Sequence, residues 1–150
     1  MSILDDHSSH AAEQLEWRVS DLPMLRDGYA DKLASAGITS FRDILSLATG
    51  PSDRRKLAQD LHMEETWLWS AVTATEMAVT LKLDKLTWQL LVNNGVYDAR
   101  ELGRCICSQL HRKLLAYKPV NHQARLTVPS IGKLQNLIDA ALVSPRLITK

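Results

Sequence analysis

Apolar residues recur at intervals of three and four along most of the chain, which is the spacing of one face of an α-helix. The pattern is clearest near the C-terminus, at Ile131, Leu134, Leu137, Ile138, Ala141 and Leu142. A longer apolar-rich stretch covers residues 64–82. The one segment that alternates like a strand, residues 125–128, ends at Pro129. The pattern therefore predicts an all-α fold.

Residues suited to helix ends divide this pattern into separate helices. Gly37 and Gly95 follow two apolar runs and favour helix C-termini, and Gly50-Pro51 separates two further helices. The helix starts are predicted at two capping boxes, Ser40-x-x-Asp43 and Asp98-x-x-Glu101, and at the N-cap residues Asp27, Ser52, Asp84 and Ser130. Residues 98–117 are treated as one helix, although Gly103 within them favours a break.

The second half of the chain repeats features of the first half at an offset of 58 residues. The offset places Leu33 on Leu91 and Gly37-Ile38 on Gly95-Val96. It also matches Leu25 with Leu83, Ser40 with Asp98, Asp43 with Glu101 and Ile44 with Leu102. The shared features are a core leucine, a glycine that ends a helix and an N-cap, so they indicate a duplicated helix–turn–helix unit around a central helical segment.

The segment Leu-x-x-Gly-Tyr-Ala-Asp-Lys-Leu-Ala-Ser-Ala-Gly-Ile-Thr-Ser-Phe-Arg-Asp-Ile-Leu, at 25–45, resembles the helix-hairpin-helix superfamily. The chain from about residue 20 to 143 resembles an uncharacterised bacterial family of unknown function built from two such units. This resemblance implies a compact helical domain over 21–143, with a partly helical or flexible N-terminal extension at 1–20 and a C-terminal tail at 144–150. It implies no established activity.

In this superfamily, units that bind DNA present a Gly-hydrophobic-Gly hairpin whose backbone N–H groups approach phosphates. The corresponding hairpins here are Met24-Leu25-Arg26 and Lys82-Leu83-Asp84. The hydrophobic centre is present in both, but both flanking glycines are missing, and Asp84 would repel a phosphate. We therefore expect that this mode of DNA binding is not used.

Charge is distributed unevenly along the chain, although the whole carries a net charge of only +1. Residues 1–50 carry a net charge of −4 and residues 101–150 a net charge of +6. Either the two ends neutralise each other, within one molecule or between two copies, or the basic third binds an anion such as nucleic acid. In one helix over 98–117, a basic face would hold Arg100, Arg104, His111 and Arg112, extended by Lys118, Arg125 and Lys133.

Tryptophan and arginine are typical of protein interfaces, and several lie in suggestive positions. Trp67 and Trp69 are two residues apart, so a regular helix cannot turn both toward the core, and Trp17 stands beside a basic residue. The cluster Arg54-Arg55-Lys56 lies in the first turn of a helix, where positive charge is unfavourable without an acidic partner. These six residues are the candidates for a protein-interaction surface.

The sequence shows no constellation for catalysis, and we expect no enzyme, no cofactor and no metal. It lacks the glycine-rich phosphate loops and the His-Glu-x-x-His motif. Cys105-x-Cys107 with His111 would need further ligands, and two helical positions two apart point away from each other. Packing as small apolar side chains is the simpler role for these thiols.

We expect a cytoplasmic protein, because the sequence has no signal-like N-terminus and no apolar run of membrane-spanning length. The leading hypothesis is a non-catalytic interaction or adaptor module that binds another protein or a second copy of itself. The alternative is sequence-independent binding of DNA or RNA through the basic C-terminal face. Neither hypothesis involves a membrane or a small-molecule substrate.

Overall fold

The computed structural model describes residues 13–117 and 128–148, and these residues form an all-α fold, as the sequence predicts. Two 3₁₀ turns, η2 (Gln14–Glu16) and η3 (Val19–Asp21), precede the α-helices. The helices are α1 (Tyr29–Ser35), α2 (Phe41–Leu47), α3 (Pro51–Leu61), α4 (Glu65–Thr80), α5 (Lys85–Asn93), α6 (Ala99–Gly103), α7 (Cys107–Ala116) and α8 (Ile131–Leu142). In this part of the chain β-structure is limited to an isolated bridge between Arg18 and Ser40. None of the described helices combines the length and apolarity needed to span a bilayer.

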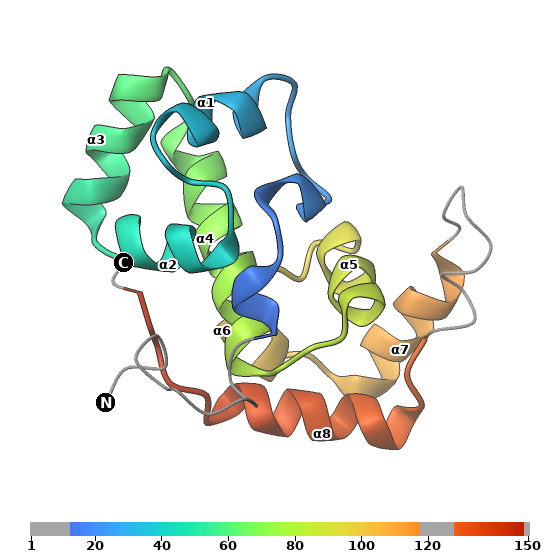
Figure 1. Cartoon of the computed structure of the whole chain (residues 1–150). Helices are drawn as coiled ribbons and strands as arrows, with labels where there is room; N and C mark the ends of the chain where they lie inside the picture. The colour runs from blue at the N-terminus through green and yellow to red at the C-terminus, as the bar shows by residue number, and fades with distance from the viewer. Residues whose placement is uncertain (1–12, 118–127, 149–150) are drawn as a thin grey trace.

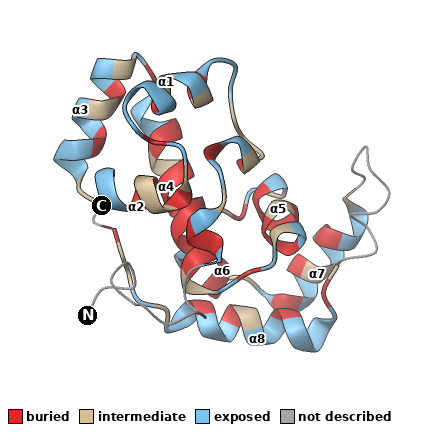
Figure 2. Ribbon diagram, viewed as in Figure 1, coloured by how far each residue is buried: buried red, intermediate tan, exposed pale blue. Residues whose placement is uncertain are grey.

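Helix α4 passes through the middle of the molecule, with α1–α3 toward one end and α5–α8 toward the other (Figure 1). Every residue from Ala71 to Val79 is buried, so this helix is covered on all sides and not on one stripe alone (Figure 2). The mostly small side chains on it, such as Ala74 and Ala78, let the surrounding helices approach closely. It is the predicted long helical segment, and its burial makes it the frame on which other residues are positioned.

Three aromatic rings from distant parts of the sequence pack together beside α4. The ring centroid of Trp88 lies 5.3 Å from that of Phe41 and 5.5 Å from that of Trp17. The Trp88 Nε1–H donates to the Ala74 carbonyl at 2.9 Å, which satisfies the one polar group of this fully buried side chain. The cluster therefore joins the N-terminal segment, α2, α4 and α5 in one core.

The turns at Gly37 and Gly95 have the same local structure. Both glycines have positive φ, at 82° and 84°, where a side chain would be strained. In each turn the following residue donates back over five positions: Ile38 N to Leu33 O and Val96 N to Leu91 O, both at 2.9 Å. The predicted role of the two glycines as helix ends is confirmed.

The N-cap predictions are confirmed at four positions and wrong at two. Ser40 forms the full capping box with Asp43, and the side chains of Asp84, Asp98 and Ser130 each accept a backbone N–H of the helix that follows. Gly28 takes the N-cap position in place of Asp27, because its left-handed conformation turns the chain into α1. Gly50 does so in place of Ser52, because Pro51 already starts α3. Asp98 caps α6 without the reciprocal box to Glu101, since its carboxylate is turned toward another partner.

Residues 98–117 form two helices and not one. Helix α6 ends at Gly103, and α7 begins only at Cys107. A Cβ on Gly103 would lie 3.1 Å from Leu142 N, so the glycine allows the close packing of α6 against the end of α8. The expected single basic face over these residues is therefore wrong.

Residues on both sides of the predicted 21–143 domain also pack against it. Leu15 and Val19 are buried, and Gln14 Nε2 donates to Leu83 O at 3.0 Å. At the other end Ile148 is buried as well. Residues 1–12 and 149–150 of the predicted extension and tail lie outside the described residues.

Candidate functional site

Two of the three tryptophans predicted to mark an interface lie mainly in the core. Trp67 is buried, its Nε1–H donates to Met24 O at 3.0 Å, and its ring meets Tyr29 edge to face at 4.7 Å. Trp17 is half-buried against Phe41 and Trp88. Trp67 also lines part of a surface cavity, and Trp69 lines a larger one.

The Trp69 ring lies within cation–π distance of two arginines. The guanidinium carbon of Arg54 lies 4.7 Å from the ring centroid, and that of Arg146 lies 5.3 Å from it. Cation–π contacts of this kind are attractive because the ring face is electronegative. The contacts bring together α3, α4 and the segment after α8.

The basic cluster 54–56 divides into one buried arginine and two exposed residues. Arg54 is 4% exposed, and its Nη1 donates to Ala48 O at 3.0 Å and to Thr49 O at 2.7 Å. These carbonyls follow the C-terminus of α2, so the guanidinium satisfies acceptors that the helix leaves open. Burial lowers the pKa of Arg54 from its ordinary value. Arg55 and Lys56 remain exposed on α3.

Beside Trp69 lies an open cleft of about 460 Å³ between α3, α4 and the start of α6. Its walls carry three carboxylates and one guanidinium, together with an indole, a phenol and several hydroxyls. The lining residues are Pro51, Arg54, Glu65, Thr66, Trp69, Ser70, Thr73, Tyr97, Asp98 and Glu101. We call this hollow the acidic cleft.

A second cavity of about 360 Å³ continues from the acidic cleft along α4. The two share Thr66, Ser70 and Tyr97 as lining residues, so they adjoin. The second cavity is completed by Met24, Arg26, Trp67 and Val92. We call these two adjoining hollows together the groove.

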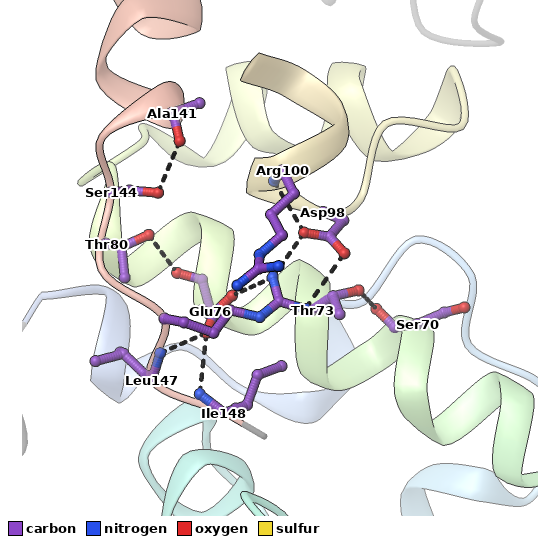
Figure 3. A network of polar contacts seen from close by, with 11 residues as sticks. Ser70, Thr73, Glu76, Thr80, Asp98, Arg100, Ala141, Ser144, Leu147 and Ile148 are labelled. Carbon is purple, nitrogen blue, oxygen red and sulfur yellow. Dashed lines mark hydrogen bonds and ion pairs between the residues drawn. The ribbon is translucent and has the colours of Figure 1, made fainter. Parts of the chain in front are cut away.

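At the inner side of the acidic cleft, a buried carboxylate holds the segment that follows α8 (Figure 3). Glu76, in the middle of α4, is 1% exposed. Its Oε2 accepts the backbone N–H of Leu147 at 2.7 Å and of Ile148 at 3.1 Å, and its Oε1 accepts Arg146 Nη1 at 3.1 Å. One side chain therefore recognises both the backbone and the guanidinium of residues 146–148.

Asp98 completes this arrangement from the N-terminus of α6. Its Oδ1 accepts Arg146 Nη1 at 2.8 Å, and its Oδ2 lies 3.5 Å from Nη2. The same carboxylate accepts the Arg100 N–H and so caps α6. We call the site formed by Trp69, Glu76 and Asp98 the arginine site.

Burial raises the pKa of Glu76 above its ordinary value, because the charged form is costly away from water. The N–H groups of Leu147 and Ile148 and the charge of Arg146 act in the opposite direction. The docked segment therefore favours the charged form of this carboxylate.

In the two segments predicted as degenerate hairpins, the N–H groups of Leu25, Lys82 and Leu83 donate to backbone carbonyls. In the second, Lys82 adopts a left-handed conformation, and the N–H groups of Lys82 and Leu83 donate to Val79 O and Ala78 O. The Asp84 carboxylate then caps α5 where an anion would otherwise bind. In the first, Leu25 N donates to Leu22 O, and Met24 and Leu25 pack partly against the core while Arg26 pairs with Glu64.

The residues of the predicted basic face are spread over three helices. Arg100 and Arg104 are exposed at α6, Arg112 is exposed on α7 and Lys133 is exposed on α8. His111 Nε2 lies 3.0 Å from Pro129 O, which gives this side chain a structural contact. Lys118 and Arg125 lie outside the described residues.

The two thiols contact different carbonyls. Cys105 Sγ donates to Glu101 O at 3.3 Å, and Cys107 Sγ, which is buried, donates to Ile131 O at 3.4 Å. Burial raises the pKa of Cys105. Within residues 13–117 and 128–148, no three His, Cys, Asp or Glu side chains converge as a metal site would need.

The arginine site was not predicted, although the sequence carries a signal for half of it. Glu76 is the one charged residue between positions 66 and 81, in an otherwise apolar and small-residue stretch. A lone carboxylate there is rarely buried without a partner. Its partner Arg146 is 70 positions away, and only the folded chain identifies it.

Comparison with known proteins supplies a family and no close relative. The model of a family described as domain of unknown function, DUF4332, matches residues 23–142. No curated protein matches the chain, and no solved structure does. The match confirms that the sequence resembles a family of unknown function.

Proposed function

We propose that this chain, which belongs to the DUF4332 family of domains of unknown function, is a non-catalytic protein-interaction module. We further propose that its scaffold is a tandem, degenerate form of the helix-hairpin-helix fold. The equivalent turns at Gly37 and Gly95, 58 residues apart, support this second proposal. Under it, the hairpins have lost phosphate binding and the scaffold serves another purpose.

The acidic cleft is the observation that carries the proposal. One of its three carboxylates, Asp98, is paired with Arg146, and the other two outnumber the one guanidinium of the lining. Trp69 and Tyr97 provide aromatic surface beside them. Carboxylates and aromatic rings together attract arginine and lysine side chains. The adjacent arginine site already shows this preference, because Asp98 and Trp69 contact the chain's own Arg146.

The shape of the groove favours a peptide over a compact small molecule. The acidic cleft and the second cavity adjoin along α4, so an extended segment fits them better than a single rigid group. Hydroxyls of Thr66 and Ser70 line both and provide hydrogen-bonding groups for a peptide backbone. A basic, extended segment of another protein, or of a second copy of this chain, has the required chemistry.

The test is calorimetric titration of the full chain with an acetylated hexa-arginine peptide. We expect saturable binding that weakens with added salt, since the contacts include charge pairs at a surface. The paired substitution Glu65→Gln and Glu101→Gln removes two of the cleft carboxylates without changing their size. It should reduce the affinity at least about tenfold, which corresponds to about 1.4 kcal/mol.

The matched control is Asp60→Asn, which removes an exposed carboxylate of α3 that does not line the acidic cleft. This variant should bind the peptide as the unmodified chain does. Equal losses in the cleft variant and the control would mean that only net charge matters. That result, or no binding at all, would overturn the proposal.

Nucleic-acid binding remains the second hypothesis, and the described residues support it less. Exposed arginines at α6 and α7 favour it. Against it, the basic residues do not share one helix face, and the N–H groups of Leu25, Lys82 and Leu83 in the hairpins already have backbone partners. Phosphate binding would depend steeply on salt, which distinguishes it from a groove-centred peptide contact.

A further inference from the structure

The arginine site is occupied by a segment of the same chain that binds in an extended form. Residues after α8 form no helix, and they are held by a guanidinium, two consecutive backbone N–H groups and one buried aliphatic side chain. These are the contacts that a groove makes with a bound peptide. The arginine site itself is rigid, because Glu76 belongs to the fully buried part of α4.

The arginine site and the segment that occupies it belong to different parts of the chain. Trp69, Glu76 and Asp98 all lie within residues 23–142, which the family model matches. Arg146, Leu147 and Ile148 lie beyond that match. The binding site is thus part of the family domain, whereas the segment that fills it follows the domain.

The contacts specify what another occupant must carry. Arg146 Nη1 alone contacts both Glu76 and Asp98, so these two contacts require only a positive charge. Arginine is favoured over lysine because its second nitrogen, Nη2, also lies 3.5 Å from Asp98 Oδ2 and its planar group lies 5.3 Å from the centroid of the Trp69 ring. The next two residues must have free backbone N–H groups for Glu76, which excludes proline at both. Both must be aliphatic, because Leu147 packs partly against the core and Ile148 is 4% exposed.

We propose that the arginine site is a peptide-recognition site for partner segments of the form arginine–aliphatic–aliphatic, and that Arg146–Ile148 is its internal occupant, which such a partner displaces. This inference rests on the proposed function, because it names the partner segment of an interaction module. The open acidic cleft beside Asp98 gives an incoming segment a first binding surface. The internal segment can then leave the arginine site while residues 143–145, a short linker, keep it attached to α8.

The affinity of a free peptide that displaces the internal segment can be predicted. A short linker holds the internal segment at an effective concentration in the order of millimolar. A free peptide with the same contacts must therefore compete, and it binds weakly to the unmodified chain. Weakening the internal segment should strengthen binding of the free peptide.

The probe is the acetylated peptide Ser-Pro-Arg-Leu-Ile-Thr-Lys, the sequence of residues 144–150, carrying a fluorescent label. It is titrated by anisotropy into the full chain and into the full-chain variant Arg146→Ala. We expect the variant to bind at least about tenfold more tightly. The same peptide with alanine in place of arginine should bind neither protein, and adding Asp98→Asn to the variant should abolish binding.

Hydrogen exchange keeps the proposal testable if Arg146→Ala does not fold. In the unmodified chain, the amides of Leu147 and Ile148 are protected by Glu76. Millimolar unlabelled peptide should remove this protection, and the alanine-substituted peptide should not. Protection that persists at saturating peptide, or equal binding of both peptides, would overturn the inference.

The two proposals fail separately. Hexa-arginine binding that depends on Glu65 and Glu101, with the amides of residues 147 and 148 still protected, would support the interaction module and overturn the displacement. Loss of hexa-arginine binding together with peptide-dependent release of the internal segment would overturn the acidic cleft as the site and retain the arginine site.

Discussion

A single carboxylate, Glu76, connects the centre of the molecule to its C-terminal segment. It is buried in the middle of α4 and contacts residues 70 to 72 positions away. A buried charge is tolerated only when paired and hydrogen-bonded, and here two backbone N–H groups and the Arg146 guanidinium provide that. Glu76 is therefore charged in the folded protein only while it is paired with residues 146–148.

Arg146→Ala should destabilise the protein substantially. Removing one partner of a buried pair leaves the other charge uncompensated, which costs roughly 3 kcal/mol in comparable cases. Chemical denaturation should show this loss in the free energy of unfolding. The matched control Arg55→Ala, at an exposed arginine of α3, should change it by no more than about 0.5 kcal/mol. Equal effects would mean that the Arg146 pairing contributes nothing.

Asp43 provides a pH-dependent contribution to stability. Its Oδ2 accepts the N–H groups of Thr39 at 3.0 Å and of Ser40 at 3.1 Å, and these bonds lower its pKa below the ordinary 3.8. A lowered pKa stabilises the fold above pH 3.8, and the contribution is lost as the pH falls through the folded-state value.

Asp43→Asn should therefore lower the free energy of unfolding by about 1 kcal/mol at neutral pH, as for lost caps. The difference from the unmodified chain should shrink at a pH well below 3.8, where the carboxylate takes up its proton in the folded protein. Urea titrations at the two pH values measure it, with Asp60→Asn as control. A difference that does not change with pH would contradict this role of the charge.

At the scale of elements, the turns of the chain were the most predictable features. Gly37, Gly95, Ser40, Asp84 and Ser130 act as the sequence indicates, because glycine conformation and cap hydrogen bonds are local. The failures at Asp27 and Ser52 occurred where a neighbouring glycine or proline determined the entry to the helix. Local rules therefore predicted how helices end and begin, within one or two residues.

Gly37→Ala and Gly95→Ala should destabilise the protein equally. Both positions have positive φ, and nothing lies within 4 Å of an added Cβ, so the cost is backbone strain alone, about 1 kcal/mol each. Thermal unfolding of both variants checks this. Lys82→Gly, at a non-glycine residue with φ of 51°, is the opposite control and should stabilise the chain. Clearly unequal losses would contradict the equivalence of the two turns.

Gly103→Ala tests the contact between α6 and α8. The added Cβ would lie 3.1 Å from Leu142 N and 3.2 Å from Leu142 Cα, and backbone cannot move aside cheaply. We expect a loss of roughly 1–3 kcal/mol, as for overpacked sites. The control Gly132→Ala, in α8 with free space around it, should be neutral or slightly stabilising. If both variants gain stability, the close packing is not required.

At the scale of the whole molecule, the aromatic side chains serve packing more than recognition. Trp17, Trp67 and Trp88 join segments far apart in the sequence, and only Trp69 lines the acidic cleft. The acidic first third and basic last third do not by themselves specify a partner. In the proposed module, the local arrangement of three carboxylates beside Trp69 does so.

The nucleic-acid hypothesis has a direct test at this scale. Arg104→Glu combined with Arg112→Glu reverses two exposed charges that do not line the acidic cleft. Hexa-arginine binding should not weaken in this variant. Labelled duplex DNA should not bind the unmodified chain with the steep salt dependence of phosphate contacts. DNA binding that is steep in salt and lost in the variant would instead favour the basic surface.

The sequence by itself determined the helical class, most helix ends and the equivalent glycine turns, because these depend on residues within one or two turns of each other. The close packing of α6 against α8 at Gly103, the burial of Arg54 and the pairing of Glu76 with Arg146 were decided only by the tertiary structure. Each depends on a partner brought close by folding: Leu142 for Gly103, the α2 carbonyls for Arg54, and the segment after α8 for Glu76. Such contacts have no fixed spacing along the chain, so no repeating pattern of residues predicts them.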